Sequence, residues 1–134
     1  MKNIAKIKIT LTLLVITYSY SCKAQLQQTP MPEQLIIGTW VHENEPGNKW
    51  QFTTNGICYW KNENNIIQDT FTYSISYTSP QCGYEVRTSG NQFYYLKLVD
   101  QAQDQYCYEI GVDNESLSIN YLGTSGFNLF IKEQ

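Results

Sequence analysis

Apolar and polar residues alternate along most of the chain after residue 34, a pattern typical of strands with one packed face and one wet face. The clearest run is 70–78, where an aromatic or aliphatic residue at every second position is separated by Thr or Ser. Turn signals interrupt such runs about every ten residues, among them Asn55-Gly56, a dipeptide that favours a tight hairpin. No later stretch has the 3.6-residue period of a long helix. The predicted strands are 36–42, 49–54, 57–62, 69–78, 84–88, 92–99, 106–112, 116–122 and 127–132.

The connections between these strands are all short, so consecutive strands should pair as an antiparallel meander. An open meander has two exposed edges, and closure into a barrel removes both. The expected fold over residues 35–134 is therefore all-β, an up-and-down barrel of about eight to nine strands. Such a barrel has room inside for its own side chains or for one small ligand. The presumed inner face carries large rings: Trp50, Phe52, Phe71, Tyr73, Tyr77, Tyr106, Tyr108, Tyr121 and Phe127.

The first 24 residues have a different pattern. Three lysines precede an apolar run at 9–16, and the sequence then becomes small and polar, which is the layout of a secretory signal peptide. The apolar run is much shorter than the roughly 20 residues of a transmembrane helix. We expect cleavage after Ala24, followed by an extended tether at 25–34. The alternative is a lipoprotein site, with lipidated Cys22 as the new N-terminus.

Cleavage at this site changes the charge of the chain. All twelve acidic residues follow residue 24, whereas only five basic residues do, so the mature net charge is −7. The basic residues are Lys49, Lys61, Arg87, Lys97 and Lys132. An acidic chain without a basic stripe lacks the electrostatic footprint of a nucleic-acid-binding protein. We therefore expect no nucleic acid as a partner, and membrane attachment only if Cys22 is lipidated.

The sequence offers little for catalysis. His42 is the only histidine, and no nucleophile or acid motif surrounds it. No Cys/His spacing of the zinc type is present. Acidic residues from different strands could converge as a catalytic pair, but no motif indicates one. We predict a protein that is not an enzyme and that needs neither a cofactor nor a metal.

Three cysteines follow the predicted cleavage site: Cys58, Cys82 and Cys107. In an oxidising compartment this odd number predicts one disulfide and one free thiol. Every second turn of a meander lies at the same end of the barrel, so all three cysteines are expected at one end. Several pairings are then geometrically possible, and the bonded pair must have its Cα atoms within about 7 Å. Cys82 lies in a turn and can reach either neighbour, so we expect it to be one member of the pair.

The first predicted strand opens with Gly38-Thr39-Trp40, and a Gly-x-Trp on strand one of a meandering barrel resembles the lipocalin superfamily. The chain is similar, over roughly residues 35–134, to the short lipocalin-like domain proteins exported by Gram-negative bacteria. Two further segments carry the resemblance: Ser79-Pro80-Gln81-Cys82-Gly83 and Tyr106-Cys107-Tyr108-Glu109. It implies a periplasmic or secreted protein, or an outer-membrane lipoprotein in the alternative reading.

The resemblance also implies roles for individual residues. Gly38 would let the first strand bend at the closed end of the barrel, and Trp40 would pack across that end against a basic residue of the last strand, Lys132. The two cysteine-containing segments recur together in the family, which implies a Cys82–Cys107 disulfide.

Two functions fit these observations. The first, favoured by the resemblance, is binding of a small apolar or amphipathic ligand, with Tyr73, Tyr77 and Tyr108 as the expected lining because tyrosine combines apolar area with a hydroxyl. The second is a protein-interaction or inhibitor barrel with a filled core. In that case Trp60, expected on the outer face beside Cys58, would be an anchor.

Overall fold

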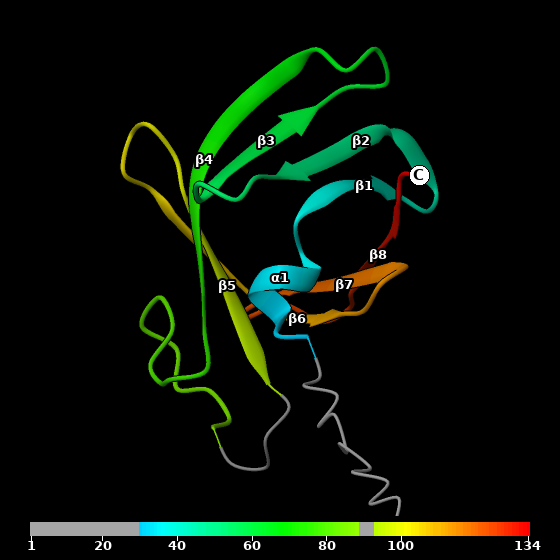
Figure 1. Ribbon diagram of the computed structural model, residues 1–134. Coiled ribbons are helices and arrows are strands. Elements are labelled where there is room, and N and C mark those ends of the chain that lie inside the picture. Colours follow the sequence, from blue (N-terminus) through cyan, green and yellow to red (C-terminus); the bar gives the residue numbers. More distant parts are fainter. Residues whose placement is uncertain (1–29, 89–92) are drawn as a thin grey trace, which may run out of the picture.

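The protein is a closed antiparallel barrel, as the sequence predicts. The computed structural model describes residues 30–88 and 93–134, in which each strand pairs with the next along the chain and β1 pairs with β8 (Figure 1). The strands are β1 Gly38–His42, β2 Glu45–Phe52, β3 Ile57–Lys61, β4 Ile67–Ser76, β5 Tyr94–Val99, β6 Gln105–Val112, β7 Ser116–Tyr121 and β8 Asn128–Lys132. The predicted signal peptide, both candidate processing sites and the first half of the tether, residues 25–29, lie outside the described residues.

Two predicted elements are wrong. Residues 84–88 are not a strand: this part of the β4–β5 connection contains only an isolated bridge between Gln81 and Tyr84. β4 and β5 pair directly with each other, so the barrel is closed without a further strand and offers no free edge to this segment. The second error is at the end of the tether, where Pro32–Leu35 forms one turn of helix, α1, instead of extended chain. Proline at the first helical position favours this start because its missing N–H would have no helical partner.

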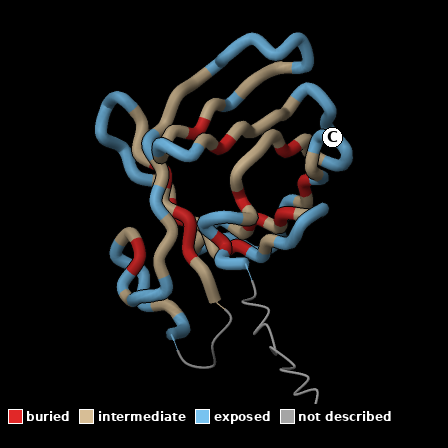
Figure 2. Tube along the Cα trace, in the orientation of Figure 1, coloured by how far each residue is buried: buried red, intermediate tan, exposed pale blue. Residues whose placement is uncertain are grey.

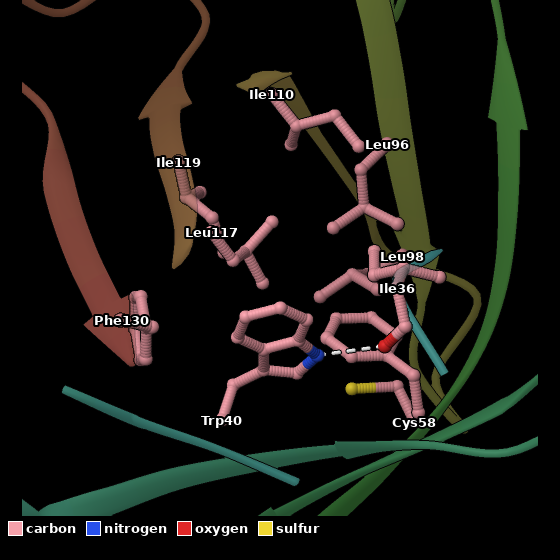
Figure 3. Packing of buried hydrophobic residues seen from close by; sticks show 10 residues of the cluster. Ile36, Trp40, Cys58, Leu96, Leu98, Ile110, Leu117, Ile119 and Phe130 are labelled. Carbon is pink, nitrogen blue, oxygen red and sulfur yellow. Dashed lines mark hydrogen bonds between the residues drawn. The ribbon is translucent and has the colours of Figure 1, made fainter. Parts of the chain in front are cut away.

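The two ends of the barrel differ. We call the end that carries α1 the sealed end, and the end with the β1–β2, β3–β4, β5–β6 and β7–β8 turns the open end. At the sealed end Trp40 Nε1 donates a hydrogen bond to the Ile36 carbonyl at 2.6 Å (Figure 3). Lys132 Nζ, from β8, donates to the Leu35 carbonyl at 3.1 Å. α1 is therefore attached to the first strand and the last strand at once.

The core lies inside the barrel between this seal and the open end. Buried residues occur at separated positions along the strands, whereas the turns are mostly exposed (Figure 2). Figure 3 shows the indole of Trp40 beside Leu117 and Phe130, with Leu96, Leu98 and Ile110 further along the interior. Burying these side chains contributes roughly 1.5–3 kcal/mol each, so the core is the main stabilising element of the fold.

Two strands present the opposite face from the one predicted. On β3, Cys58 is fully buried and pairs opposite inward-facing Phe52, so Cys58 and Trp60 face the interior and not the outer surface. On β8, Phe130 is buried and Ile131 is exposed, which reverses the predicted inner set of that strand. Strand side chains alternate with a period of two, so an error of one residue exchanges the two faces.

Two aromatic residues predicted for the inner face are outside it. Phe127 is 70% exposed. It lies just before β8, at an odd-numbered position like the outward-facing Ile131, so its side chain points away from the interior. Tyr77 is 66% exposed because β4 ends at Ser76 and the chain leaves the barrel there. The inner surface therefore carries a different set of rings from the predicted one, because Trp60 and Phe130 face inward while Tyr77 and Phe127 do not.

The predicted disulfide between Cys82 and Cys107 is present, with the Cα atoms 5.9 Å apart. Contrary to the sequence prediction, the three cysteines do not lie at one end, because without strand 84–88 the β5–β6 turn lies at the end opposite the β4–β5 connection. That connection instead folds back along the outside of the barrel, where Cys107 points outward and is buried beneath it. Cys58, on the inner face, is the free thiol.

Candidate functional site

The interior of the barrel is hollowed near its open end. A pocket of about 310 Å³ lies where β2, β3, β4 and β6 approach that end, and Leu98 of β5 also lines it. Pockets that hold small molecules in proteins start at a volume of about 300 Å³ and are mostly apolar, with a few placed polar groups. Every residue that lines this pocket belongs to a strand, so regular hydrogen-bonded backbone positions the site.

Aromatic rings make up most of the wall. Trp50 of β2 and Trp60 of β3 are direct partners in the antiparallel register, which places both side chains on the same face of the sheet. Trp50 reaches across the interior to Tyr108 of β6, with the ring centroids 5.9 Å apart and the planes nearly perpendicular. Phe71 of β4 makes a similar edge-to-face contact with Tyr106 of β6 at 6.1 Å. Four strands thus contribute five rings to one pocket.

One amide orients both indoles. Trp50 Nε1 and Trp60 Nε1 each donate a hydrogen bond to Asn48 Oδ1, and both distances are 3.1 Å. Both indole N–H groups therefore have a partner within the protein. The two indoles line the pocket without exposing an unsatisfied donor.

The polar side of the pocket is acidic. Asp69, directly opposite Trp60 in the β3–β4 register, lines the pocket. Its Oδ1 accepts a hydrogen bond from the backbone N–H of Thr70 at 2.7 Å. Among residues 30–88 and 93–134, the ion pair found is Lys49 with Glu133, so Asp69 has no basic partner in that part of the chain.

Further carboxylates surround the adjacent tyrosine. Tyr106 donates its hydroxyl hydrogen to Asp100 Oδ2 at 3.2 Å. This hydrogen bond is the largest cause of a raised Tyr106 pKa, followed by desolvation and by the negative charges of Asp100, Asp104 and Asp69. Three acidic groups therefore act on one hydroxyl at the open end, which indicates a negative potential there.

Tyr108 forms the deeper part of the wall. Burial is the main cause that raises its pKa to about 12, with smaller contributions from Tyr121, Tyr106 and Cys58. Its ring also contacts Tyr121 at a centroid distance of 5.2 Å. The hydroxyl is therefore neutral at physiological pH and serves as a hydrogen-bonding group, not as a base.

The three tyrosines expected to line one ligand site are not brought together. Tyr108 lines the open-end pocket, as described. Tyr73 faces a shallow hollow beside α1 at the other end, and its hydroxyl donates to the Thr53 carbonyl at 2.7 Å. Tyr77, beyond the end of β4, is exposed on the surface. The three tyrosines therefore do not line one common pocket in this structure.

Sequence reasoning missed most of the pocket. The sequence pattern does not single out Asn48, Trp50, Asp69 or Tyr106 as ligand-binding residues, and it predicts Trp60 on the outer face. The β2–β3 register pairs Trp50 with Trp60, whereas a two-residue Asn55-Gly56 turn would pair Trp50 with Lys61. In the observed turn Gly56 has a positive φ and Asn55 does not, so the loop is longer than the dipeptide predicts. No local pattern brings β4 and β6 to the same place.

His42 contacts two asparagines and one aromatic ring. Its Nε2 lies 3.4 Å from Asn128 Oδ1, its Nδ1 accepts a hydrogen bond from the Asn44 N–H, and its ring makes an edge contact with Phe130. Within residues 30–88 and 93–134, no group of three His, Cys, Asp or Glu residues is placed to hold a metal ion. The same residues contain no helix long and apolar enough to cross a membrane.

Comparison with known proteins adds no assignment. No known family model matches the chain, and a search of curated proteins finds no significant match.

Proposed function

We propose that this protein is an exported barrel that binds one small amphipathic molecule in the open-end pocket. The observation that carries the proposal is the pocket itself, a hollow of about 310 Å³ whose wall combines five aromatic rings with one carboxylate. Tyrosine and tryptophan supply large apolar area at low conformational cost, and the carboxylate supplies orientation. The lipocalin-like resemblance supports the same function, because lipocalins hold ligands inside the barrel.

The test is direct binding of a neutral apolar fluorophore, N-phenyl-1-naphthylamine. We expect saturable binding of one molecule, weakened about tenfold by Trp60→Ala, a loss of about 1.4 kcal/mol. Tyr77→Ala is the matched control, because it removes an exposed aromatic side chain outside the pocket. Binding that does not saturate, or that responds equally to both substitutions, contradicts the proposal. Native mass spectrometry of protein from its own periplasm would then identify a retained ligand as added mass.

The alternative function is protein interaction through the rim of the open end. Trp60 is 42% exposed, and Ile66 and Ile67 of the β3–β4 hairpin are more exposed still. Exposed apolar residues that gather at one place often mark an interaction surface. Ligand binding is the better-supported function because the Trp60 indole is held toward the pocket by Asn48. Loss of a co-purifying protein on Ile66→Ser/Ile67→Ser substitution, with probe binding unchanged, would favour the alternative.

Export is part of the proposal. A Cys82–Cys107 disulfide is typical of proteins that fold in an oxidising compartment, and it supports the signal-peptide prediction. N-terminal sequencing of protein secreted by a Gram-negative host should give Gln25 as the first residue. A diacylglyceryl-modified Cys22 would instead make the mature protein a lipoprotein.

A further inference from the structure

The open-end pocket offers aromatic rings and a carboxylate, while three of the four indole and phenol donors in its wall are already used and only the Tyr108 hydroxyl remains. The indole N–H groups of Trp50 and Trp60 are bound to Asn48, and the Tyr106 hydroxyl is bound to Asp100. An anionic ligand needs N–H or O–H donors or a basic side chain to replace its hydration shell. This wall contains no basic residue, so it is poorly suited to an anion.

Asp69 is the charged group of the pocket, and it lacks a counter-ion within the described residues. Thr70 occupies one carboxylate oxygen, and the nearest β-strand partner of Asp69 is Trp60, which is aromatic and not basic. Lys49 is not available to Asp69, because its ammonium group pairs with Glu133 at 2.8 Å. The ligand itself can therefore supply the compensating positive charge.

The surrounding charge points in the same direction. Asp100 and Asp104, in the β5–β6 turn, lie close enough to Tyr106 to affect its hydroxyl, as Asp69 does. Acidic groups concentrated at the mouth of a cleft attract cations and raise their local concentration. Indole and phenol rings attract a cation that lies over the face of the ring within about 6 Å of its centroid.

From this arrangement we propose that the pocket binds an alkylated ammonium ion, with its cationic head among the rings of Trp50, Trp60 and Tyr106 and facing Asp69. The inference rests on the proposed ligand-binding function and specifies its ligand class. A bulky, weakly hydrated head fits better than a bare ammonium, because the wall supplies many ring faces but few acceptors. A pocket of about 310 Å³ also has room for the alkyl groups.

The test compares three probes of similar shape that differ in charge: choline, 3,3-dimethyl-1-butanol and 3,3-dimethylbutanoate. Isothermal titration calorimetry at low and high salt gives their affinities. We expect choline to bind at least about tenfold more tightly than the neutral alcohol, the carboxylate to bind more weakly than both, and salt to reduce the preference for choline. Equal or tighter binding of the alcohol, or no binding of choline, overturns the inference.

A variant pair assigns the preference to Asp69. Asp69→Asn keeps the shape and the acceptor for the Thr70 N–H but removes the charge, so it should weaken choline binding about tenfold and leave the alcohol unchanged. Glu115→Gln, in the exposed β6–β7 turn at the sealed end, removes the same charge far from the pocket and should change neither. Equal effects of the two substitutions on choline would contradict a role for Asp69.

The two proposals fail separately. If N-phenyl-1-naphthylamine binds saturably and its binding depends on Trp60, but choline binds no more tightly than the neutral alcohol, the protein is a ligand-binding barrel and the proposal of a cationic ligand is wrong. Loss of Trp60-dependent binding of the neutral fluorophore removes the ligand-binding function itself.

Discussion

Lys132 Nζ lies 4.9 Å from the ring centroid of Trp40, and the two residues are direct partners across the β1–β8 seam. Each is also hydrogen-bonded to a carbonyl of the segment that contains α1, Trp40 to Ile36 and Lys132 to Leu35. The pairing of the first strand with the last strand is therefore reinforced by a cation–π contact and by a shared attachment to the helix. The predicted packing of Trp40 against Lys132 is present.

Replacement of Trp40 by Ala should lower the free energy of unfolding by about 3–5 kcal/mol, because it removes a fully buried indole from the core at the sealed end. Urea denaturation followed by circular dichroism measures the loss. Trp60→Ala is the control, since that indole is partly exposed, and its loss should be clearly smaller. A cost below about 1 kcal/mol for Trp40→Ala would mean that the seal is not important for stability.

Gly38→Ala should destabilise the protein by about 1–3 kcal/mol through backbone strain. The φ angle of Gly38 is +131°, and a Cβ atom there would lie 2.8 Å from Lys132 Cε. Gly47→Ala in β2 is the matched control, because the nearest atoms to its Cβ would be 4.0 Å away in Glu63. The same denaturation experiment compares the two variants. Equal effects would show that the conformation of Gly38 is not the cause.

Reduction of the Cys82–Cys107 disulfide should cost about 3 kcal/mol in unfolding free energy, because the closed loop spans 25 residues. The measurement compares denaturation with and without a phosphine reductant. Cys58→Ala is the control and should show the same sensitivity, since Cys58 is not in the bond. Non-reduced peptide mapping must give a peptide that joins Cys82 to Cys107, and a Cys58-containing disulfide would refute the pairing.

Stability should fall at alkaline pH because of Cys58. Burial raises the pKa of its thiol in the folded protein, whereas in the unfolded chain the thiol ionises near about pH 8.5. Below about pH 8 the thiol is protonated in both states, so stability does not change with pH. As the pH rises further, the Cys58 thiol ionises in the unfolded chain but not in the folded protein, which lowers the free energy of unfolding. The expected contribution is a loss of about 1.4 kcal/mol between pH 7 and pH 9.5.

Cys58→Val separates this contribution from that of the other titrating groups. The variant keeps a small apolar side chain in the core and cannot ionise, so its stability should decline less over the same pH range. Urea midpoints at pH 7, 8.5 and 9.5 for both proteins measure the difference. Parallel pH profiles would contradict a protonated, buried thiol in the folded state.

The alternation of residues along the chain was sufficient to predict the fold class. Runs such as 70–78 place apolar side chains on one face, and short turns leave adjacent antiparallel pairing as the simple connection. Closure follows because an open meander would have two free edges. The Cys82–Cys107 pairing was also predicted, with the help of the family resemblance, although its reason is packing of the β4–β5 connection over β6 and not the shared end of a meander.

The assignment of faces was less secure where the alternation is ambiguous. β3 reads Ile57-Cys58-Tyr59-Trp60, in which both faces carry apolar or aromatic residues, so the pattern alone does not show which face is buried. The register with β2 decides it, because Phe52 and Cys58 are opposite each other. The same applies to β8, where Leu129, Phe130 and Ile131 are consecutive apolar residues. Both errors changed which side chains enter the interior.

The sequence by itself determined a small antiparallel barrel, an acidic surface and a disulfide that includes Cys82, because these depend on local periodicity, composition and cysteine count. Only the tertiary structure decided the site. Trp50, Asp69 and Tyr106 come from three different strands, and β6 is separated from β2 and β4 by at least one other strand around the barrel. They meet because closure brings the inner faces of non-adjacent strands together across the interior, a relation set by curvature and register that no local pattern in the chain records.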